Sequence, residues 1–174
     1  MKIIIYGSKY GNSKQYATEL SQKTNIEKKS YKRVKDINQY DTIIFIGSLY
    51  AGKTLGLKKT FKKLKNFNDK KIVVATVGLA DPTSLENTNK IKNDLKRELG
   101  YELYKKAKIF HLRGGIDYPK LNFTHRLMMS MLVKHLKGLP EEKQTDETKQ
   151  MIETYNKKVD FVNLESLNLI VEFL

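Results

Sequence analysis

The sequence predicts a doubly wound α/β domain in which helices cover both faces of a parallel sheet. Three short and mostly apolar runs, 42–47, 72–77 and 108–112, alternate with helical segments at 55–64 and 84–99. Strands that are apolar at successive positions are buried on both faces, and helical connections between strands make them parallel. The 174 residues contain no linker or internal repeat, so we expect a single domain that spans the whole chain.

The first strand runs directly into a loop that suits an anion. Ile3–Tyr6 is apolar and rich in β-branched residues, and it is followed by the small polar residues Gly7–Ser13. This loop carries two serine hydroxyls and a glycine that lets backbone amides approach a ligand, ahead of an amphipathic helix. It suits a terminal phosphate monoester. An ordinary strand-to-helix turn with an N-cap serine is the alternative.

The remaining elements complete the expected layers. The segment 14–23 reads as a helix, and 28–34 as a weak polar strand at a sheet edge. We expect 141–160 to form a polar-faced helix that completes the last helical layer, whereas the apolar tail 166–174 has no assigned role. The inward residues of that helix are expected to be Met151, Ile152, Tyr155 and Val159.

The first loop carries a family resemblance. Ile4–Ser13, which reads IIYGSKYGNS, and Ala17 in the next helix resemble the flavodoxin signature, in which the loop wraps the phosphate of FMN. Ser13 stands where that family usually has Thr, and it keeps the hydroxyl. The resemblance implies FMN as cofactor and a flavodoxin-like five-stranded sheet of order 2-1-3-4-5, with the ligand beyond the carboxyl ends of the strands. It assigns FMN binding to Ser8, Lys9, Tyr10, Gly11, Asn12 and Ser13.

The second loop fits two different motifs. Gly47–Thr54 matches G-x-x-x-x-G-K-[ST], the P-loop pattern of nucleotide hydrolases. Against a P-loop, no strand ends in an Asp that would hold magnesium, and the bulky Leu49 and Tyr50 occupy the middle of the loop. The flavodoxin resemblance instead implies that Tyr50 or Leu49 packs on the isoalloxazine ring. The residues expected around the ring edge are Ser48, Ala51, Gly52 and Lys53.

The third loop follows the strand 72–77 as the other flavin-binding loop of the family does. It lacks the Tyr that usually stacks on the ring, so the residue covering that face stays open. A simpler interpretation is a helix entry capped by Asp81, Thr83 or Ser84. The residues expected to bind the cofactor here are Gly78, Leu79, Ala80 and Asp81.

The segment 113–138 is an insertion after the last strand that a short flavodoxin does not need. It predicts a basic amphipathic helix with an unusually broad apolar surface. That surface can pack on the domain, form a dimer interface, lie on a membrane or receive a flat hydrophobic substrate. The apolar side carries Leu121, Phe123, Leu127, Met128, Met131, Leu132, Val133 and Leu136, and the basic side Arg126, Lys134, His135 and Lys137.

The insertion also resembles that of the menaquinone-dependent protoporphyrinogen IX dehydrogenases. The resemblance lies in Asp117, Tyr118, Pro119, Lys120, Arg126, Met128 and Met129. It implies an oxidoreductase of heme biosynthesis that passes electrons from a reduced substrate through FMN to a quinone, at the inner face of the cell membrane. The sequence demands no catalytic acid or base for this reaction. The residues expected to meet substrate or membrane are Arg113, Tyr118, Lys120 and Arg126, with Lys53 beside them.

Charge and composition limit the partners. The net charge of +14 departs from the acidic electron carriers of the flavodoxin family and points to an anionic membrane surface, an acidic redox protein or a carboxylate-bearing substrate. We expect no nucleic acid, and a homodimer stays open. The absence of cysteine excludes disulfides and thiol chemistry, and the three His are not spaced as the ligands of a metal site are. We expect a cytoplasmic protein. An electron-carrier flavodoxin and an NAD(P)H:quinone reductase are the alternative functions.

Overall fold

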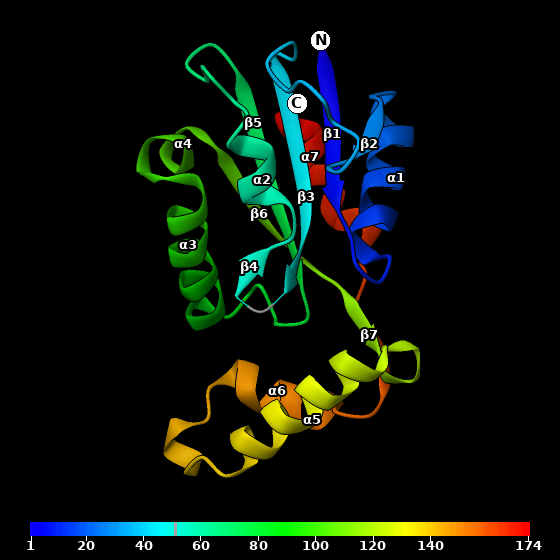
Figure 1. Cartoon of the computed structure of the whole chain (residues 1–174), viewed down its shortest axis with the longest axis vertical. Coiled ribbons are helices and arrows are strands. Elements are labelled where there is room, and N and C mark those ends of the chain that lie inside the picture. The colour runs from blue at the N-terminus through cyan, green and yellow to red at the C-terminus, as the bar shows by residue number, and fades with distance from the viewer. Residues whose placement is uncertain (51) are drawn as a thin grey trace.

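Five parallel strands form the central sheet of the computed structural model, which describes residues 1–50 and 52–174 (Figure 1). They are β1 (Lys2–Gly7), β2 (Lys28–Ser30), β3 (Thr42–Tyr50), β5 (Lys71–Gly78) and β6 (Lys108–Arg113). Their order is β2-β1-β3-β5-β6, and neighbouring strands are parallel throughout. The short β4 (Lys53–Thr54) pairs antiparallel with the end of β3. If β4 is left out and the five parallel strands are numbered in chain order, their order in the sheet is 2-1-3-4-5, as predicted.

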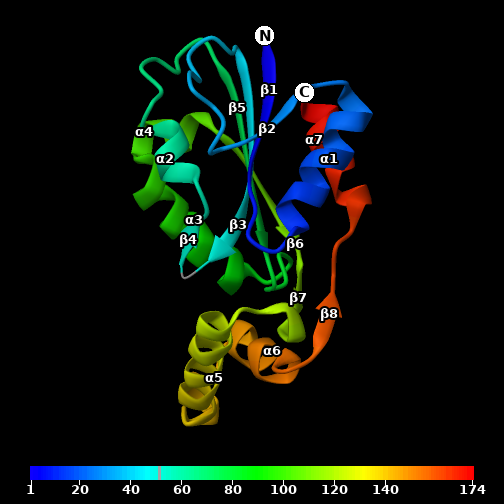
Figure 2. The ribbon, with the colours of Figure 1, turned by 45° about the vertical axis from the view of Figure 1, so that its right-hand side comes forward.

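Successive side chains of β1 enter two different cores, because they point to opposite faces of the sheet. Ile3 and Ile5 belong to the core on the side of α2, α3 and α4, and Ile4 belongs to the core on the side of α1 and α7. Figure 2 shows these helices on either side of the sheet. Their bounds are α1 (Asn12–Thr24), α2 (Leu57–Phe61), α3 (Leu85–Leu99), α4 (Tyr101–Lys106) and α7 (Asn168–Phe173). Both faces are covered, which confirms the predicted three-layer class.

Two predicted elements are shorter than expected. The edge strand 28–34 stops at Ser30, and the chain beyond it crosses the edge as a loop that buries Val34 and Ile37. The helix 55–64 begins at Leu57, because Gly56 precedes it in a left-handed conformation with φ of 84°. Both changes meet the carboxyl end of β1, because the N–H of Tyr31 donates to the carbonyl of Tyr6 at 2.9 Å and the carbonyl of Leu55 packs on Gly7 with no room for a Cβ.

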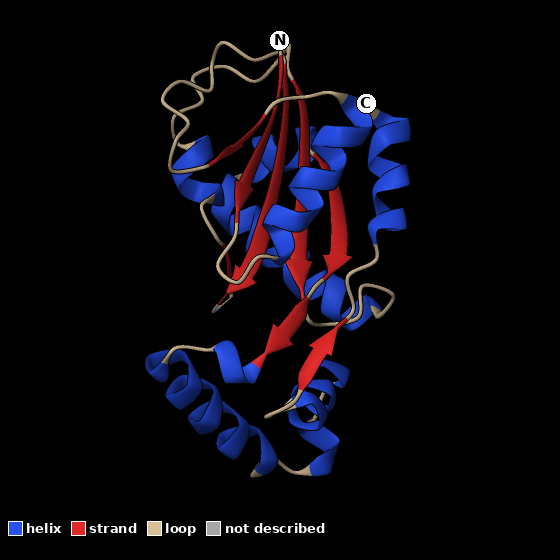
Figure 3. Ribbon diagram, turned by 90° about the vertical axis from the view of Figure 1, so that its right-hand side faces the viewer, coloured by secondary structure: helices blue, strands red, loops and turns tan. Residues whose placement is uncertain are grey.

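After β6 the chain leaves the sheet and returns only at Phe161, and we call residues 115–160 the excursion. Its elements are β7 (Gly115–Asp117), the 3-10 helix η1 (Tyr118–Lys120), α5 (Phe123–Lys137), η2 (Glu141–Lys143), α6 (Asp146–Thr154) and β8 (Lys158–Asp160). β7 and β8 pair antiparallel, with Gly115 opposite Asp160. Figures 1 and 3 show the excursion beyond the end of the sheet at which the parallel strands point. Within the described residues, no helix has both the length and the apolar composition needed to cross a membrane.

The expected role of 141–160 in the last helical layer is wrong. Only residues 146–154 are helical in α6, and α6 packs against α5 and α3 as part of the excursion. The reason is the pairing of β8 with β7, which returns the chain to the sheet only at Phe161. The layer is completed by the tail instead, where Leu167 and Ile170 of η3 (Leu164–Leu167) and α7 are fully buried.

Candidate functional site

The predicted cofactor residues lie in three loops that follow β1, β3 and β5 at one edge of the sheet. Parallel strands end at the same edge, so loops far apart in sequence meet there. The hydroxyl oxygens of Ser13 and Ser48 are 2.7 Å apart and join the first loop to the second. Leu49 packs on Gly78 so closely that a Cβ added there would lie 2.8 Å from Leu49 Cδ1, which joins the second loop to the third.

The first loop fits a phosphate group. Its Gly11 has φ of 107° and is the N-cap of α1, and among residues 1–50 and 52–174 no side chain caps this helix. The first-turn amides of α1 are therefore free of side-chain acceptors, and the first turn carries no acidic residue. Ser8 Oγ accepts the N–H of Gly11 at 3.1 Å. A phosphate oxygen could accept this N–H in place of the Ser8 hydroxyl. Lys9 and Tyr10 are exposed beside them.

The second loop is a hairpin, and this contradicts the P-loop alternative. Leu49 pairs with Thr54 and Tyr50 with Lys53, so the backbone is used in strand pairing instead of cradling phosphates. The following helix begins only at Leu57. Ala51 lies outside the described residues, whereas Gly52 and Lys53 are exposed at the hairpin tip.

The second loop also separates the two candidates for contact with the flavin ring. Leu49 is engaged with Gly78 on β5. The Tyr50 ring instead lies 5.2 Å from Lys9 Nζ, on the side of the first loop. Tyr50 is therefore the aromatic side chain that the second loop presents between the first loop and the excursion.

The third loop is a helix entry, and it is tied to the end of β6. Ser84 is the N-cap of α3, and Asp81 Oδ1 accepts the N–H of Thr83 at 2.9 Å. Hydrogen bonds from the Thr83 amide and hydroxyl, with a smaller contribution from Arg113, hold the pKa of Asp81 below its usual range. Arg113 Nη1 lies 3.7 Å from Asp81 Oδ2, and its guanidinium stacks at 4.0 Å on the ring of Phe161. Gly78, Leu79 and Ala80 are half-buried between these groups.

Three predicted substrate or membrane residues lie in the excursion, away from the loops. Tyr118 is 1% exposed and packs against Tyr155 with ring centroids 5.3 Å apart. It is a core residue of the excursion and cannot touch an external surface, and its burial raises the pKa of the phenol to about 12. Lys120 pairs with Asp117 at 3.4 Å, and Arg126 donates to the carbonyl of Pro119 at 3.3 Å, both in solvent.

The excursion reaches the loops through Gly115 and His125, two of its own residues that the sequence does not single out. Asn12 Nδ2 donates to the carbonyl of Gly115 at 2.7 Å, next to the first loop. His125 of α5 contacts Tyr10 and Tyr50. A lone histidine in an amphipathic helix carries no spacing signal, and only its place three residues after the N-cap Asn122 distinguishes it.

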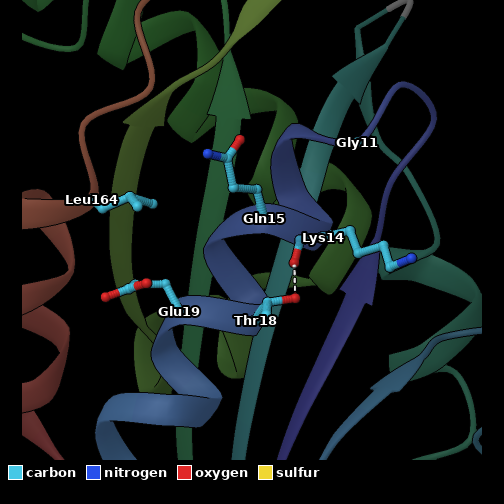
Figure 4. Close-up of a pocket in the computed structure, with 6 residues that line it drawn as sticks. All are labelled: Gly11, Lys14, Gln15, Thr18, Glu19 and Leu164. Atoms are coloured by element: carbon cyan, nitrogen blue, oxygen red, sulfur yellow. Dashed lines mark hydrogen bonds between the residues drawn. The ribbon is translucent and has the colours of Figure 1, made fainter.

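A separate hollow of about 420 Å³ lies along α1 and is not this site. Figure 4 shows its lining, in which Gln15 and Glu19 of α1 lie on the side of Leu164 and the side chain of Lys14 points away from it. Thr18 and Gly11 complete the lining. Of these residues only Gly11 belongs to the three loops. The loops themselves carry the residues that the sequence predicts to bind FMN.

Two kinds of comparison relate the chain to known proteins. A family model described as "Flavodoxin domain" matches residues 3–143. Similar solved structures include a flavoprotein in complex with FMN from Lactobacillus acidophilus NCFM, with 16% identity, TM-score 0.45 and coverage of 64% of this chain and 91% of the other. They also include the Trp repressor binding protein from Bacillus subtilis, with 17% identity, TM-score 0.44 and coverage of 66% and 83%. A flavodoxin from the domain Archaea has 17% identity, TM-score 0.40 and coverage of 88% and 95%.

The curated proteins contain no match to the chain. The family match covers most of the sequence, including all three loops and α5. It bears out the expected fold and, because FMN is the cofactor of flavodoxins, the expected cofactor. The chain belongs to the flavodoxin domain family.

Proposed function

We propose that the protein is an FMN-dependent oxidoreductase that passes electrons from a reduced organic substrate to a quinone, in the manner of the quinone-linked protoporphyrinogen IX dehydrogenases. The observation that carries the proposal is the position of α5, whose first turn contacts two of the cofactor loops while most of its apolar side chains stay in solvent. In an electron-carrier flavodoxin, the same face would instead serve as the docking surface for the redox partner.

The protein supplies the binding site, and FMN supplies the redox chemistry: when bound, it takes electrons from one partner and gives them to the next. The uncapped amides of α1 and the Ser8 hydroxyl would hold the phosphate. Tyr50 and the third loop would hold the ring. Arg113 is fixed by Asp81 and Phe161 at the end of β6, where its charge favours an anionic substrate group.

The exposed face of α5 suits an apolar partner. Phe123 is 81% exposed, Met131 65% and Leu127 51%, in a helix that also carries exposed basic residues. Contiguous apolar side chains of this kind mark interaction sites, and a basic amphipathic helix favours the surface of an anionic membrane. A quinone dissolved in that membrane would then be delivered beside the cofactor loops.

A flavodoxin-type electron carrier is the second candidate, and the net charge of +14 favours it with an acidic redox protein as partner. An NAD(P)H:quinone reductase is a third. The three differ in what reduces and what reoxidises the flavin. Purified protein should first show the absorption bands of bound FMN. Anaerobic reduction by protoporphyrinogen, followed by reoxidation with a menaquinone analogue, supports the dehydrogenase.

The decisive comparison uses variants of α5. Phe123→Ser combined with Leu127→Ser and Met131→Ser should reduce reoxidation by the quinone at least tenfold and leave the FMN spectrum unchanged. Leu85→Ser on α3, where a leucine is 76% exposed, is the control for loss of an exposed apolar side chain. Rapid reduction by NADPH, or quinone reoxidation that is equal in all variants, would contradict the proposal.

A further inference from the structure

His125 links α5 to two of the three cofactor loops. Its Nδ1 is hydrogen-bonded to the hydroxyl of Tyr10 in the first loop, and the two rings meet edge to face with centroids 5.6 Å apart. The ring of Tyr50 in the second loop lies 5.1 Å from the imidazole. The Tyr50 hydroxyl also lies 3.9 Å from Sδ of Met128 on the same helix. His125 is 8% exposed, although it belongs to a helix with most of its large side chains in solvent.

The start of α5 fixes His125 in this position. Asn122 is the N-cap, and its Oδ1 accepts the backbone N–H of His125 at 2.8 Å. This bond holds the first turn of the helix and with it the direction of the imidazole. His125 and Val133 are the buried residues of α5, so the helix is anchored on one side and free on the other.

The rest of the excursion is attached at its base. The hydroxyl of Tyr16 in α1 donates to the carbonyl of Arg113 at 2.8 Å and accepts the N–H of Asn163 at 3.0 Å. It therefore ties together the chain that leaves for the excursion and the chain that returns. A further link, between Lys90 of α3 and Glu147 of α6 at 2.8 Å, lies at the surface, where ion pairs contribute little.

We propose that His125 is a positioning residue that latches α5 against the first and second loops and thereby controls the passage of the flavin ring into and out of its site. The inference rests on the proposed function, because it takes these loops as the FMN site. Tyr10 and Tyr50 come from different loops and meet the same imidazole, so a ring that passes between the loops has to separate these contacts. The latch raises the barrier in both directions, and its removal changes the rates of FMN exchange more than the affinity.

The experiment measures FMN binding by stopped-flow fluorescence and FMN release after dilution. His125→Ala should accelerate both association and dissociation about tenfold, which corresponds to about 1.4 kcal/mol, while Kd stays within about threefold. Tyr10→Phe removes the hydroxyl partner and should accelerate both steps to a similar extent. The double variant should add little, because the two changes break one shared contact. His125→Asn keeps a polar atom near the position of Nδ1 and should restore part of the slow exchange.

His135→Ala is the matched control, because His135 is exposed in the last turn of the same helix. Lys90→Gln breaks the surface ion pair with Glu147 and should leave both rates within twofold of the wild type. Rates in His125→Ala within twofold of the wild type overturn the latch, and so does equal acceleration in His135→Ala. If His125→Ala misfolds by circular dichroism, Tyr10→Phe gives the same test from an exposed loop. Failure of the wild type to bind FMN would instead overturn the proposed function, so the two failures are distinguishable.

Discussion

The sheet and the excursion bury their apolar side chains to very different extents. Ile4 and Ile44 are fully buried between helices and strands, as are most apolar residues of β1, β3 and β5. On α5, Phe123 and Met131 are mostly exposed. The sheet therefore gains its stability from internal packing. The apolar face of the excursion contributes little to folding and is available for binding.

The largest expected effect separates the two regions by stability. Ile44→Ala should lower the free energy of unfolding by about 2–5 kcal/mol, because it leaves a cavity between β3 and α1. Met131→Ala should change it by less than about 0.5 kcal/mol, since that side chain is already in solvent. Urea denaturation followed by circular dichroism measures both. Equal costs at the two positions would show that the α5 face is packed in solution, as in a dimer.

Binding to anionic vesicles should depend on the excursion. Replacing Lys120, Arg126, Lys134 and Lys137 with Ala should lower vesicle affinity about a thousandfold at low salt, because each basic group near an anionic surface contributes about 1 kcal/mol. Raising the salt should weaken binding of the wild type in the same direction. Co-sedimentation with anionic and neutral vesicles is the measurement.

The matched control removes four exposed lysines from α2 and the segment after it. Lys58, Lys59, Lys62 and Lys65 carry the same total charge but lie on the body of the domain. Their replacement should leave most of the vesicle binding. Equal losses in both quadruple variants would mean that net charge, and not the excursion, drives the association.

The first loop can be tested with two glycines that both have a positive φ. Gly11 has φ of 107° and Gly100 has φ of 81°, and neither would place a Cβ within 4 Å of another group. Gly11→Val should weaken FMN binding about tenfold or more, because a positive φ strains a β-branched residue by about 1–3 kcal/mol and the loop must change shape. Gly100→Val strains the junction of α3 and α4 but should leave FMN affinity unchanged. Fluorescence titration of FMN distinguishes them.

The smallest expected effect is a pH dependence confined to the sheet. His111 on β6 accepts or donates a 2.8 Å hydrogen bond with Thr76, and burial lowers its pKa from 6.5 to about 4. The unfolded chain therefore binds a proton that the folded chain does not, so stability is full above pH 6.5 and is lost as the pH falls toward 4. Between pH 6.5 and 5.5 the loss should be about 1 kcal/mol. His111→Gln should remove this component of the slope in urea denaturation, and an unchanged slope would assign it to other groups.

The two regions also differ in how far the sequence predicts them. The strands of the sheet are continuous apolar runs separated by helices, so their order and the loops at their ends follow from local pattern and family resemblance. The β3–β4 hairpin is hidden by residues that also fit a P-loop, because the pattern Gly47–Thr54 does not specify whether the backbone pairs or binds phosphate. Such a choice is made by tertiary contacts, here of Leu49 with Gly78.

The excursion is predicted less completely. Its helix α5 follows from the apolar and basic pattern, but α6 has the amphipathic pattern of a layer helix, and only the pairing of β8 with β7 assigns it to the excursion. The short tail shows no clear helical period, yet Leu167 and Ile170 close the core beside α1. Tyr118, expected to meet substrate or membrane, is buried, and the contact with the first loop comes from His125, for which the sequence carries no signal.

The antiparallel pair β7–β8 gives the molecule a modular design. Gly115 lies opposite Asp160, and the N–H of Phe161 donates to the carbonyl of Gly114 at 3.2 Å, so the two ends of the excursion are neighbours in space. A two-residue turn can join strands placed in this way, and shortening the connection lowers the entropy cost of closing it. The excursion can therefore be removed by cutting the chain at Gly115 and Asp160 and joining the two ends. This deletion leaves intact the sheet, the three loops and the hydrogen bonds of Tyr16 with Arg113 and Asn163. A cut inside α5 would instead leave α6 without its partner helix.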